Sequence, residues 1–223
     1  MNTTDLQKLE FGPRSGAKAS VIWLHGLGAD GSDFEPIVPE LGLPATVRFV
    51  FPHAPVRPVT VNGGMPMRAW YDINSLGGGF VEDSLGIHQS QQQVERLIAA
   101  EAAHGVPPER IVLAGFSQGG AVVLHTGLRH PARLAGIMAL STYLPASERL
   151  EAERSAANAD TPIFMAHGQY DQIVPLAIGA ASRDRLLAVG QPLEWHEYPI
   201  EHSVSLAEVR DIAAWLRRTL ALD

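Results

Sequence analysis

One serine, at the junction of a strand-like run and a helix-like run, constrains this chain more than any other feature. Residues 115–119 read G-F-S-Q-G, with the apolar run 111–114 before them and the helix-like stretch 119–130 after them. A serine at such a corner lies on a sharp turn that exposes its hydroxyl. Side chains at the two glycine positions would crowd the turn and block close packing of the helix against the strand. The pattern therefore predicts that Ser117 is an exposed nucleophile.

Apolar strand-like runs and helix-like stretches alternate along the rest of the chain. The strand-like runs are 20–24, 47–51, 111–114, 135–140, 163–166 and 193–198, and the helix-like stretches are 83–103, 119–130, 175–190 and one that begins at 203–205. Ser205 and Glu208 have the spacing of a capping box at the start of this last helix. The order is typical of a mostly parallel sheet with helices on both faces. Because 46% of the 223 residues are hydrophobic and no linker interrupts them, we expect one α/β domain over 1–223.

Charge and composition exclude several classes of function. The net charge is -7 and no long block of like charge occurs, which argues against a nucleic-acid partner and gives no polybasic membrane patch. No stretch approaches the ~20 apolar residues of a membrane span, so stable membrane insertion is not expected. Residues 1–10 are polar and lack an apolar signal segment, which favours a cytoplasmic location. The chain has no cysteine, and this excludes disulfides and thiol catalysis.

The predicted nucleophile needs a histidine base, and the base needs a carboxylate that fixes its tautomer. In α/β-hydrolases, which use such a strand-to-helix serine, these groups follow one another in the order Ser, acid, His. His196 and His202 are the histidines that come late enough in the chain. His196 lies inside the run 193–198, where its side chain would point from a face of the sheet. His202 follows that run, so it is the predicted base.

The acid must lie between the serine and the base. The candidates include Asp160, Asp171, Asp184, Glu194 and Glu201. Asp160 precedes a strand-like run, Asp184 lies within a helix-like stretch, and Glu201 is adjacent to the base and cannot easily face its ring. Asp171 follows the run 163–166 closely, at the carboxyl end where catalytic loops gather in open α/β sheets. Asp171 is therefore the predicted acid, with an aspartate that binds its own turn as the alternative; His167 is expected to be structural.

Acyl transfer at a serine also needs two N–H groups that bind the oxyanion. One should come from Gln118, the residue after the nucleophile, and the other from the loop after an early strand. The loop H-G-L-G at 25–28 fits, and the N–H of Leu27 is the candidate. We expect His25 to hold this loop by hydrogen bonds rather than to act as a second base. The histidines are scattered and no H-E-x-x-H occurs, so no metal or other cofactor is expected.

The segment 57–83 departs from the regular alternation. It is rich in Gly and Pro, has no clear period, and contains Trp70, Leu76 and Phe80. Loops of this length in a compact domain are usually functional or disordered, and the aromatic residues argue against disorder. Two interpretations stay open: the segment passes over the top of the sheet and contributes to a substrate groove, or it is a surface loop with a small apolar anchor of its own.

Longer motifs extend from about residue 21 to residue 216. They are H-G-L-G at 25–28, P-H-A-P-V-R-P-V-T at 52–60, W-Y-D at 70–72, G-F-S-Q-G-G at 115–120, D-Q-I-V-P at 171–175 and H-S at 202–203. In this order they resemble the phospholipase/carboxylesterase family, which contains carboxylesterases and acyl-protein thioesterases. The resemblance implies an α/β-hydrolase fold without a large cap domain. It also implies Ser117, Asp171 and His202 as nucleophile, acid and base, with the oxyanion donors at Leu27 and Gln118.

The same resemblance implies where the substrate binds. An acyl-binding groove would be bordered by the loop after Trp70, in which we include Leu76 and Phe80, together with Tyr143 and Leu176. The family often has Trp at the position of Tyr143, and the three glycines at 77–79 make that stretch less bulky than in some relatives. Both departures would alter the preferred acyl length.

The expected function is hydrolysis of a carboxylic ester or thioester through an acyl-serine intermediate. The substrate would be a small acyl ester or thioester, an acylated protein or a lysophospholipid, and lysophospholipid hydrolysis is the first alternative function. A non-catalytic binding protein on a hydrolase scaffold is the second, although it would gain nothing from an unmodified serine turn. The relatives occur as monomers and dimers, and of the two a homodimer is expected for this chain.

Overall fold

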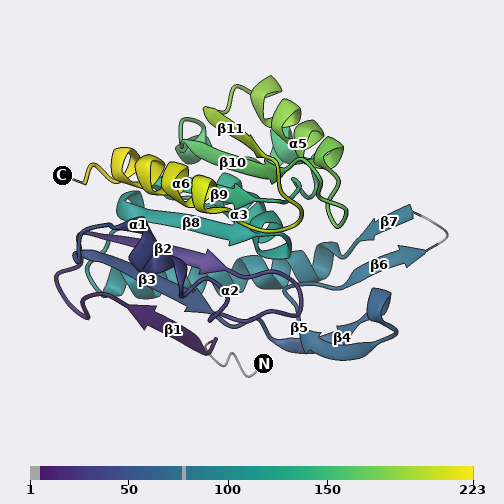
Figure 1. Ribbon diagram of the computed structural model, residues 1–223, viewed down its shortest axis with the longest axis horizontal. Helices are drawn as coiled ribbons and strands as arrows, with labels where there is room; N and C mark the ends of the chain where they lie inside the picture. The colour runs from purple at the N-terminus through teal and green to yellow at the C-terminus, as the bar shows by residue number, and fades with distance from the viewer. Residues whose placement is uncertain (1–5, 77–78, 223) are drawn as a thin grey trace.

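The computed structural model describes residues 6–76 and 79–222, without the side chains of 75–81. A seven-stranded sheet forms the centre of the molecule. Its strands lie in the order β1-β3-β2-β8-β9-β10-β11 (Figure 1). Their bounds are β1 Lys8–Phe11, β2 Ala19–Leu24, β3 Val47–Pro52, β8 Ile111–Phe116, β9 Gly136–Leu140, β10 Ile163–Gly168 and β11 Leu193–Tyr198. Strand β1 pairs antiparallel with β3, and every other neighbouring pair is parallel. The predicted mostly parallel sheet is confirmed.

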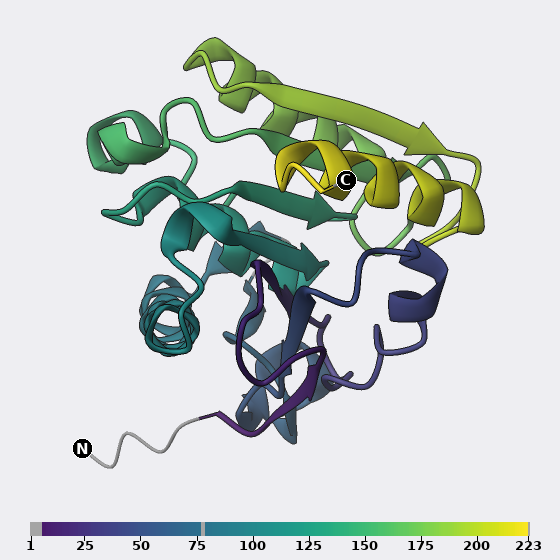
Figure 2. The ribbon, with the colours of Figure 1, turned by 90° about the vertical axis from the view of Figure 1, so that its left-hand side faces the viewer.

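Helices cover both faces of this sheet (Figure 2). The longer ones are α2 Ser84–Ala103, α3 Gln118–Arg129, α5 Leu176–Ala188 and α6 Leu206–Thr219; the short ones are α1 Ile37–Leu41, α4 Leu150–Glu153 and the 3-10 turns η1 Thr60–Asn62, η2 Pro108–Arg110 and η3 Ala156–Asn158. Helices α2, α3 and α5 pack into one apolar cluster, and α1 and α6 pack into the other.

Strand β2 shows how the sequence supplies both clusters. Its side chains alternate between the faces, so Ile22 and Leu24 join one cluster while Val21 and Trp23 join the other. All six residues of β2 are buried. A strand that is buried on both faces reads as a continuous apolar run, which is why the sequence pattern located it.

The last helix begins as the sequence predicts. The Ser205 side chain accepts a hydrogen bond from the Glu208 N–H, and the Glu208 carboxylate accepts one from the Ser205 N–H. This capping box satisfies two N–H groups that the helix itself leaves unpaired. It fixes the point at which the chain enters α6 after the loop that follows β11.

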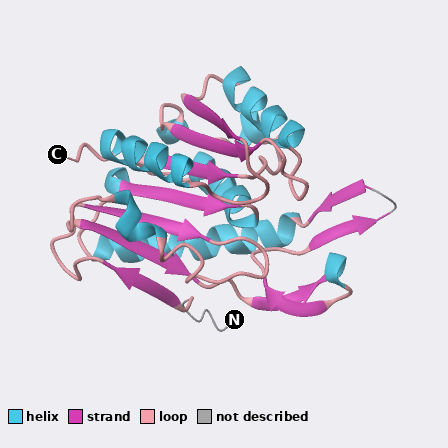
Figure 3. Ribbon diagram, viewed as in Figure 1, coloured by secondary structure: helices cyan, strands magenta, loops and turns pink. Residues whose placement is uncertain are grey.

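The segment 57–83 is more regular than the sequence indicated. Strand β4 (Val56–Val59) pairs with β5 (Met65–Arg68), and β6 (Ile73–Leu76) pairs with β7 (Gly79–Glu82), both antiparallel. These two hairpins extend beyond the carboxyl ends of the central strands (Figures 1 and 3). Short hairpins with Gly and Pro lack the apolar run that marks a core strand, so their strand pairing was not predicted from the sequence. None of the helices in the described parts of the chain is both long and apolar enough to cross a membrane.

Candidate active site

Ser117 occupies a strained turn between β8 and α3. Its backbone has φ 53° and ψ -119°, a conformation that residues with a side chain rarely adopt. A Cβ at Gly115 would lie 2.4 Å from the carbonyl of Gly119, and a Cβ at Gly119 would lie 2.5 Å from the Leu24 oxygen. Glycine at both positions therefore lets β8, α3 and β2 approach closely enough to form the turn.

Neighbouring strands hold this strained backbone in place. The N–H of Ser117 donates to the Leu140 oxygen at 2.8 Å, and its carbonyl accepts from the Thr142 hydroxyl at 2.6 Å. Strained residues of this kind persist only where the surroundings over-determine them. The side chain is thereby directed to the carboxyl edge of the sheet, where it lines a cavity. Within the described chain, the Ser117 hydroxyl itself makes no hydrogen bond.

A buried carboxylate and a histidine meet at the ends of the last two strands. Nδ1 of His202 donates to Oδ2 of Asp171 at 2.6 Å. The other carboxylate oxygen, Oδ1, accepts the N–H groups of Ile173 and Val174, each at 2.9 Å. Because the carboxylate accepts a hydrogen bond from Nδ1–H, the available lone pair of the neutral imidazole lies on Nε2. The pair therefore has the orientation that a general base requires.

His167 stabilises the loop that carries the carboxylate. Its Nε2 donates to the Val174 oxygen at 2.7 Å and lies 3.5 Å from Oδ2 of Asp171. Its ring is buried, and a Cβ at Gly179 would lie 2.4 Å from Nδ1. These contacts agree with the expected structural position of His167. The close approach of α5 at a glycine also fixes the ring beside the carboxylate.

Two backbone N–H groups next to the serine are available for a ligand. Leu27 and Gln118 both line the same cavity as Ser117. Neither N–H donates to an acceptor in the described residues, whereas the next N–H, that of Gly28, is taken by the Arg68 oxygen at 2.9 Å. Gln118 is the first residue of α3, where the N–H groups of a helix lack internal partners and favour negative charge.

His25 holds the loop with Leu27 in place. Its Nδ1 donates to the Gly26 oxygen at 2.7 Å, and its Nε2 accepts the Ala54 N–H at 3.0 Å. Burial lowers the pKa of His25 to about 4, so the ring is neutral at physiological pH. A neutral ring with both nitrogens engaged has no capacity left to act as a base, as the sequence analysis expected.

The Gln118 side chain has a position that the sequence did not indicate. Its Oε1 accepts the Trp70 N–H at 2.8 Å, and its Nε2 donates to the Tyr71 oxygen at 2.7 Å. Trp70 also donates through Nε1 to the His25 oxygen at 2.9 Å. The Trp70 side chain is fully buried, so it connects the loops beneath the cavity and does not form a wall of it.

The cavity beside Ser117, here the first cavity, has a volume of about 300 Å³. Its lining residues are Leu27, Tyr71, Ile73, Ser117, Gln118, Tyr143, Ile173, Val174 and Ile178. Of the five residues expected to bind substrate, Tyr143 lies here, whereas Trp70 and Leu176 do not. The side chains of Leu76 and Phe80 lie outside the described residues. Tyr71, the residue after Trp70, and Ile178, two positions after Leu176, line the cavity instead.

Two tyrosines form a neutral polar contact in this otherwise apolar wall. The hydroxyls of Tyr71 and Tyr143 lie 2.8 Å apart. Burial raises the pKa of both phenols. The contact therefore stays uncharged over the whole physiological range, and the first cavity presents a surface suited to an apolar chain.

Known proteins resemble this chain over nearly its whole length. The family model described as Phospholipase/Carboxylesterase matches residues 11–220. The chain belongs to the phospholipase/carboxylesterase family. Its sequence is 40% identical to acyl-protein thioesterase 1 of Mycosarcoma maydis over 234 residues, which cover 96% of this chain and 98% of that protein.

Solved structures of similar proteins share the fold over nearly the whole chain. The crystal structure of Zea mays acyl-protein thioesterase 2 matches with a TM-score of 0.86 and 27% identity, over 96% of this chain and 99% of that one. The Arabidopsis thaliana protein SOBER1 matches with a TM-score of 0.83 and 32% identity, over 91% and 99% of the two chains. Against these solved structures, the α/β-hydrolase fold expected from the sequence is confirmed.

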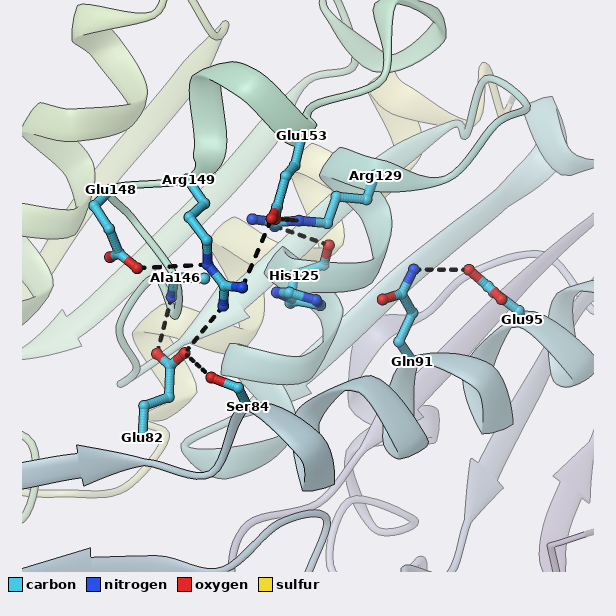
Figure 4. Close-up of polar contacts among 10 residues, drawn as sticks. All are labelled: Glu82, Ser84, Gln91, Glu95, His125, Arg129, Ala146, Glu148, Arg149 and Glu153. Atoms are coloured by element: carbon cyan, nitrogen blue, oxygen red, sulfur yellow. Dashed lines mark hydrogen bonds and ion pairs between the residues drawn. The ribbon is translucent and has the colours of Figure 1, made fainter.

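In this member of the phospholipase/carboxylesterase family, a cluster of charged residues fixes the loop that carries Tyr143 (Figure 4). Glu82, at the end of β7, accepts the Ala146 N–H at 2.9 Å and lies 4.0 Å from Arg149. Glu153 lies between Arg149, at 3.7 Å, and Arg129, at 2.9 Å. The cluster links the β6–β7 hairpin to the chain after β9.

Among the described residues, no group of three or more His, Cys, Asp or Glu side chains could hold a metal ion.

Proposed function

We propose that this protein hydrolyses carboxylic esters and thioesters through an acyl intermediate on Ser117. The observation that carries the proposal is the 2.6 Å hydrogen bond between His202 and the buried, doubly anchored Asp171. This pair lies at the same edge of the sheet as the strained Ser117 turn. The apolar first cavity and the two unpaired N–H groups adjoin that serine.

In the first half of the reaction, Nε2 of His202 takes the proton of the Ser117 hydroxyl as Oγ attacks the carbonyl carbon. Contacts of this kind often tighten only when substrate is bound, which accounts for the unpaired hydroxyl of Ser117. The carbonyl oxygen becomes an oxyanion that the N–H groups of Leu27 and Gln118 stabilise, each worth roughly 3 kcal/mol. The carbon–sulfur or carbon–oxygen bond then breaks, and His202 returns the proton to the departing atom.

In the second half, a water molecule replaces the leaving group. His202 takes one proton from the water as its oxygen attacks the acyl carbon, and the Ser117 oxygen leaves with that proton. The carboxylic acid is released and the enzyme is restored. Asp171 stays ionised throughout, because it holds the imidazole in the correct tautomer and stabilises the imidazolium that forms twice in each cycle.

The first cavity supports a substrate with an apolar acyl chain. Apart from Ser117 and Gln118, its walls are aliphatic side chains and neutral phenols, and such walls bury hydrocarbon at a gain of roughly 0.8 kcal/mol per methylene. The matched relatives named acyl-protein thioesterases support the same assignment, and we propose thioesters and esters of such acyl chains as the substrate class.

Covalent labelling tests this proposal. A fluorophosphonate probe should add to the wild type at one site, and Ser117→Ala should not be labelled, as read from the intact mass. Ser15→Ala removes an exposed serine elsewhere and should be labelled at the wild-type rate. Asp171→Asn should fold and be labelled roughly 10⁴-fold more slowly, because the imidazole loses its orientation. Equal labelling of Ser117→Ala and wild type would show that another nucleophile reacts.

A further inference from the structure

A second cavity, of about 310 Å³, adjoins the candidate active site. Its lining residues are Asp33, Phe34, Ile37, Phe116, His202, Ser203 and Val204. It shares no lining residue with the first cavity, although Phe116 and Ser117 are consecutive in the chain. The proposed nucleophile thus faces the first cavity, and the proposed base forms part of the wall of the second.

A row of aromatic side chains supports the wall of the second cavity. The rings of Trp23 and Phe34 stack at 5.0 Å, Phe34 and Phe116 lie 5.6 Å apart, and Phe116 lies 4.6 Å from the ring of His202. Trp23 and Phe34 are buried in the apolar cluster under the sheet. The row connects the core directly to the imidazole, so this wall is preformed.

Asp33 supplies a negative charge in this cavity. Its carboxylate makes no hydrogen bond or ion pair with the described residues, although its N–H is fixed by the Asp30 oxygen at 3.1 Å. Asp30, three residues earlier, differs because its carboxylate accepts both the N–H and the hydroxyl of Ser32, at 2.8 and 2.6 Å. The Asp33 side chain is exposed to solvent, but the protein atoms around it displace part of its hydration, and this desolvation, followed by the charge of Asp30, raises the pKa of Asp33. A cation beside Asp33 would offset both costs.

The geometry of acyl transfer assigns different substituents to the two cavities. The reacting carbon bears the acyl chain and the leaving group as separate substituents, and His202 must reach the leaving atom to protonate it. If the acyl chain fills the apolar first cavity, the leaving group projects toward His202. The space that receives it is bordered by His202, Ser203 and Asp33.

We propose that the second cavity binds the leaving group and that Asp33 selects leaving groups that carry a positive charge close to the ester sulfur or oxygen. The inference rests on the proposed function, because it concerns the same reaction. When the carbon–sulfur or carbon–oxygen bond breaks, its electron pair stays on the departing atom, which takes the proton of His202. The leaving group departs as a neutral thiol or alcohol, and its cation is unchanged and paired with Asp33 until release.

Two thioesters with the same butyryl group, one with a charged and one with an uncharged leaving group, isolate the effect of the leaving-group charge. One releases 2-(trimethylammonio)ethanethiol and the other its uncharged carbon isostere, 3,3-dimethylbutane-1-thiol. The kcat/KM of each is measured by thiol release at low ionic strength for the wild type, Asp33→Asn and Glu35→Gln. The two thiols differ in intrinsic reactivity, but this difference cancels when the charged-to-uncharged ratio is compared between variants. Glu35→Gln removes a nearby charge that does not line either cavity.

Asp33→Asn should lower the charged-to-uncharged ratio about two- to fivefold, which is the size expected for one solvent-exposed ion pair. Glu35→Gln should leave the ratio unchanged, and the effect of Asp33→Asn should shrink at 0.5 M NaCl because salt screens the charge. An unchanged ratio in Asp33→Asn, or an equal change in both variants, would overturn the inference. Failure of the wild type to cleave either thioester would instead overturn the proposed function, and this inference with it.

Discussion

The two cavities beside Ser117 differ in the chain segments that build them and in their charge. The first is lined from the base of the β6–β7 hairpin, the loops after β2, β9 and β10, the Ser117 turn and the first turns of α3 and α5, and its polar side chains are all uncharged. The second is lined by the chain that enters α1, the end of β8 and the loop after β11, and it holds the proposed base and the Asp33 carboxylate, which is unpaired among the described residues. One edge of the sheet thus offers an apolar side and a charged side to a single substrate.

This difference indicates that acyl specificity and leaving-group specificity are set by separate parts of the chain. Ser117 and Phe116 are neighbours at the end of β8 and face different cavities. A substitution in the wall of one cavity should therefore leave the other recognition step intact.

Among the effects that distinguish the two cavities, the largest expected is a separation of two specificities by Ile178→Ala and Ile37→Ala. Ile178→Ala should lower kcat/KM for C8–C12 acyl esters about five- to tenfold and leave acetyl esters unchanged, because it removes apolar contacts worth roughly 0.8 kcal/mol per buried methylene. Ile37→Ala should keep the acyl-length profile and lower kcat/KM for bulky leaving groups relative to small ones, because its side chain lines the second cavity. Steady-state kinetics on a matrix of acyl chains and leaving groups measures both.

Both variants need a stability control, since Ile37 begins α1 and packs at the edge of a core cluster. Thermal unfolding should show each variant folded at the assay temperature. A matrix in which Ile178→Ala and Ile37→Ala alter the same substrates in the same way would show that one continuous site, rather than two, binds the substrate.

A smaller effect concerns pH and stability at the start of α6, the helix that follows the Ser203 and Val204 wall of the second cavity. Burial raises the pKa of Glu208 to about 8, and this residue caps α6 directly after the loop with His202. Between its ordinary value near 4.5 and about 8, the folded state binds a proton that the unfolded state lacks, so stability falls as the pH rises through this window. We therefore expect the Tm of Glu208→Gln minus the Tm of the wild type to be about 3–8 °C higher at pH 8.5 than at pH 4.5.

The first cavity should show no matching dependence, since the pKa of each of its phenols is raised above the ordinary value. Tyr143→Phe should therefore keep a constant Tm difference from the wild type between pH 4.5 and 8.5, as measured by scanning calorimetry. A Tm gap between Glu208→Gln and wild type that stays constant over the same range would contradict the raised pKa of Glu208.

The sequence located the parts of the site that follow core strands. Ser117, Asp171 and His202 come just after β8, β10 and β11, whose buried apolar runs are visible in the sequence, and parallel strands bring their carboxyl ends to one edge. The wall residues could not be located in this way. Trp70 and Tyr71 are adjacent aromatics, and the sequence does not show that the Gln118 amide binds their backbone and leaves Trp70 buried beneath the cavity.

The second cavity could not be predicted from the sequence either. Phe34, Phe116 and His202 are far apart in the chain and meet through aromatic contacts across three segments. Likewise, the two hairpins of 56–82 carry too few apolar residues to stand out from a loop, although their pairing is regular. Local patterns identify strands and turns, whereas these features depend on which side chains the completed fold brings together.

The central claim is that Ser117 carries the acyl group with its chain in the first cavity. A crystal structure of the protein after reaction with a long-chain alkyl fluorophosphonate tests it most directly. We expect phosphorus bonded to Oγ of Ser117, the phosphoryl oxygen accepting from the N–H groups of Leu27 and Gln118, and the alkyl chain between Tyr71 and Ile178. An adduct on another residue, or an alkyl chain beside Asp33 and Ile37, would contradict the account.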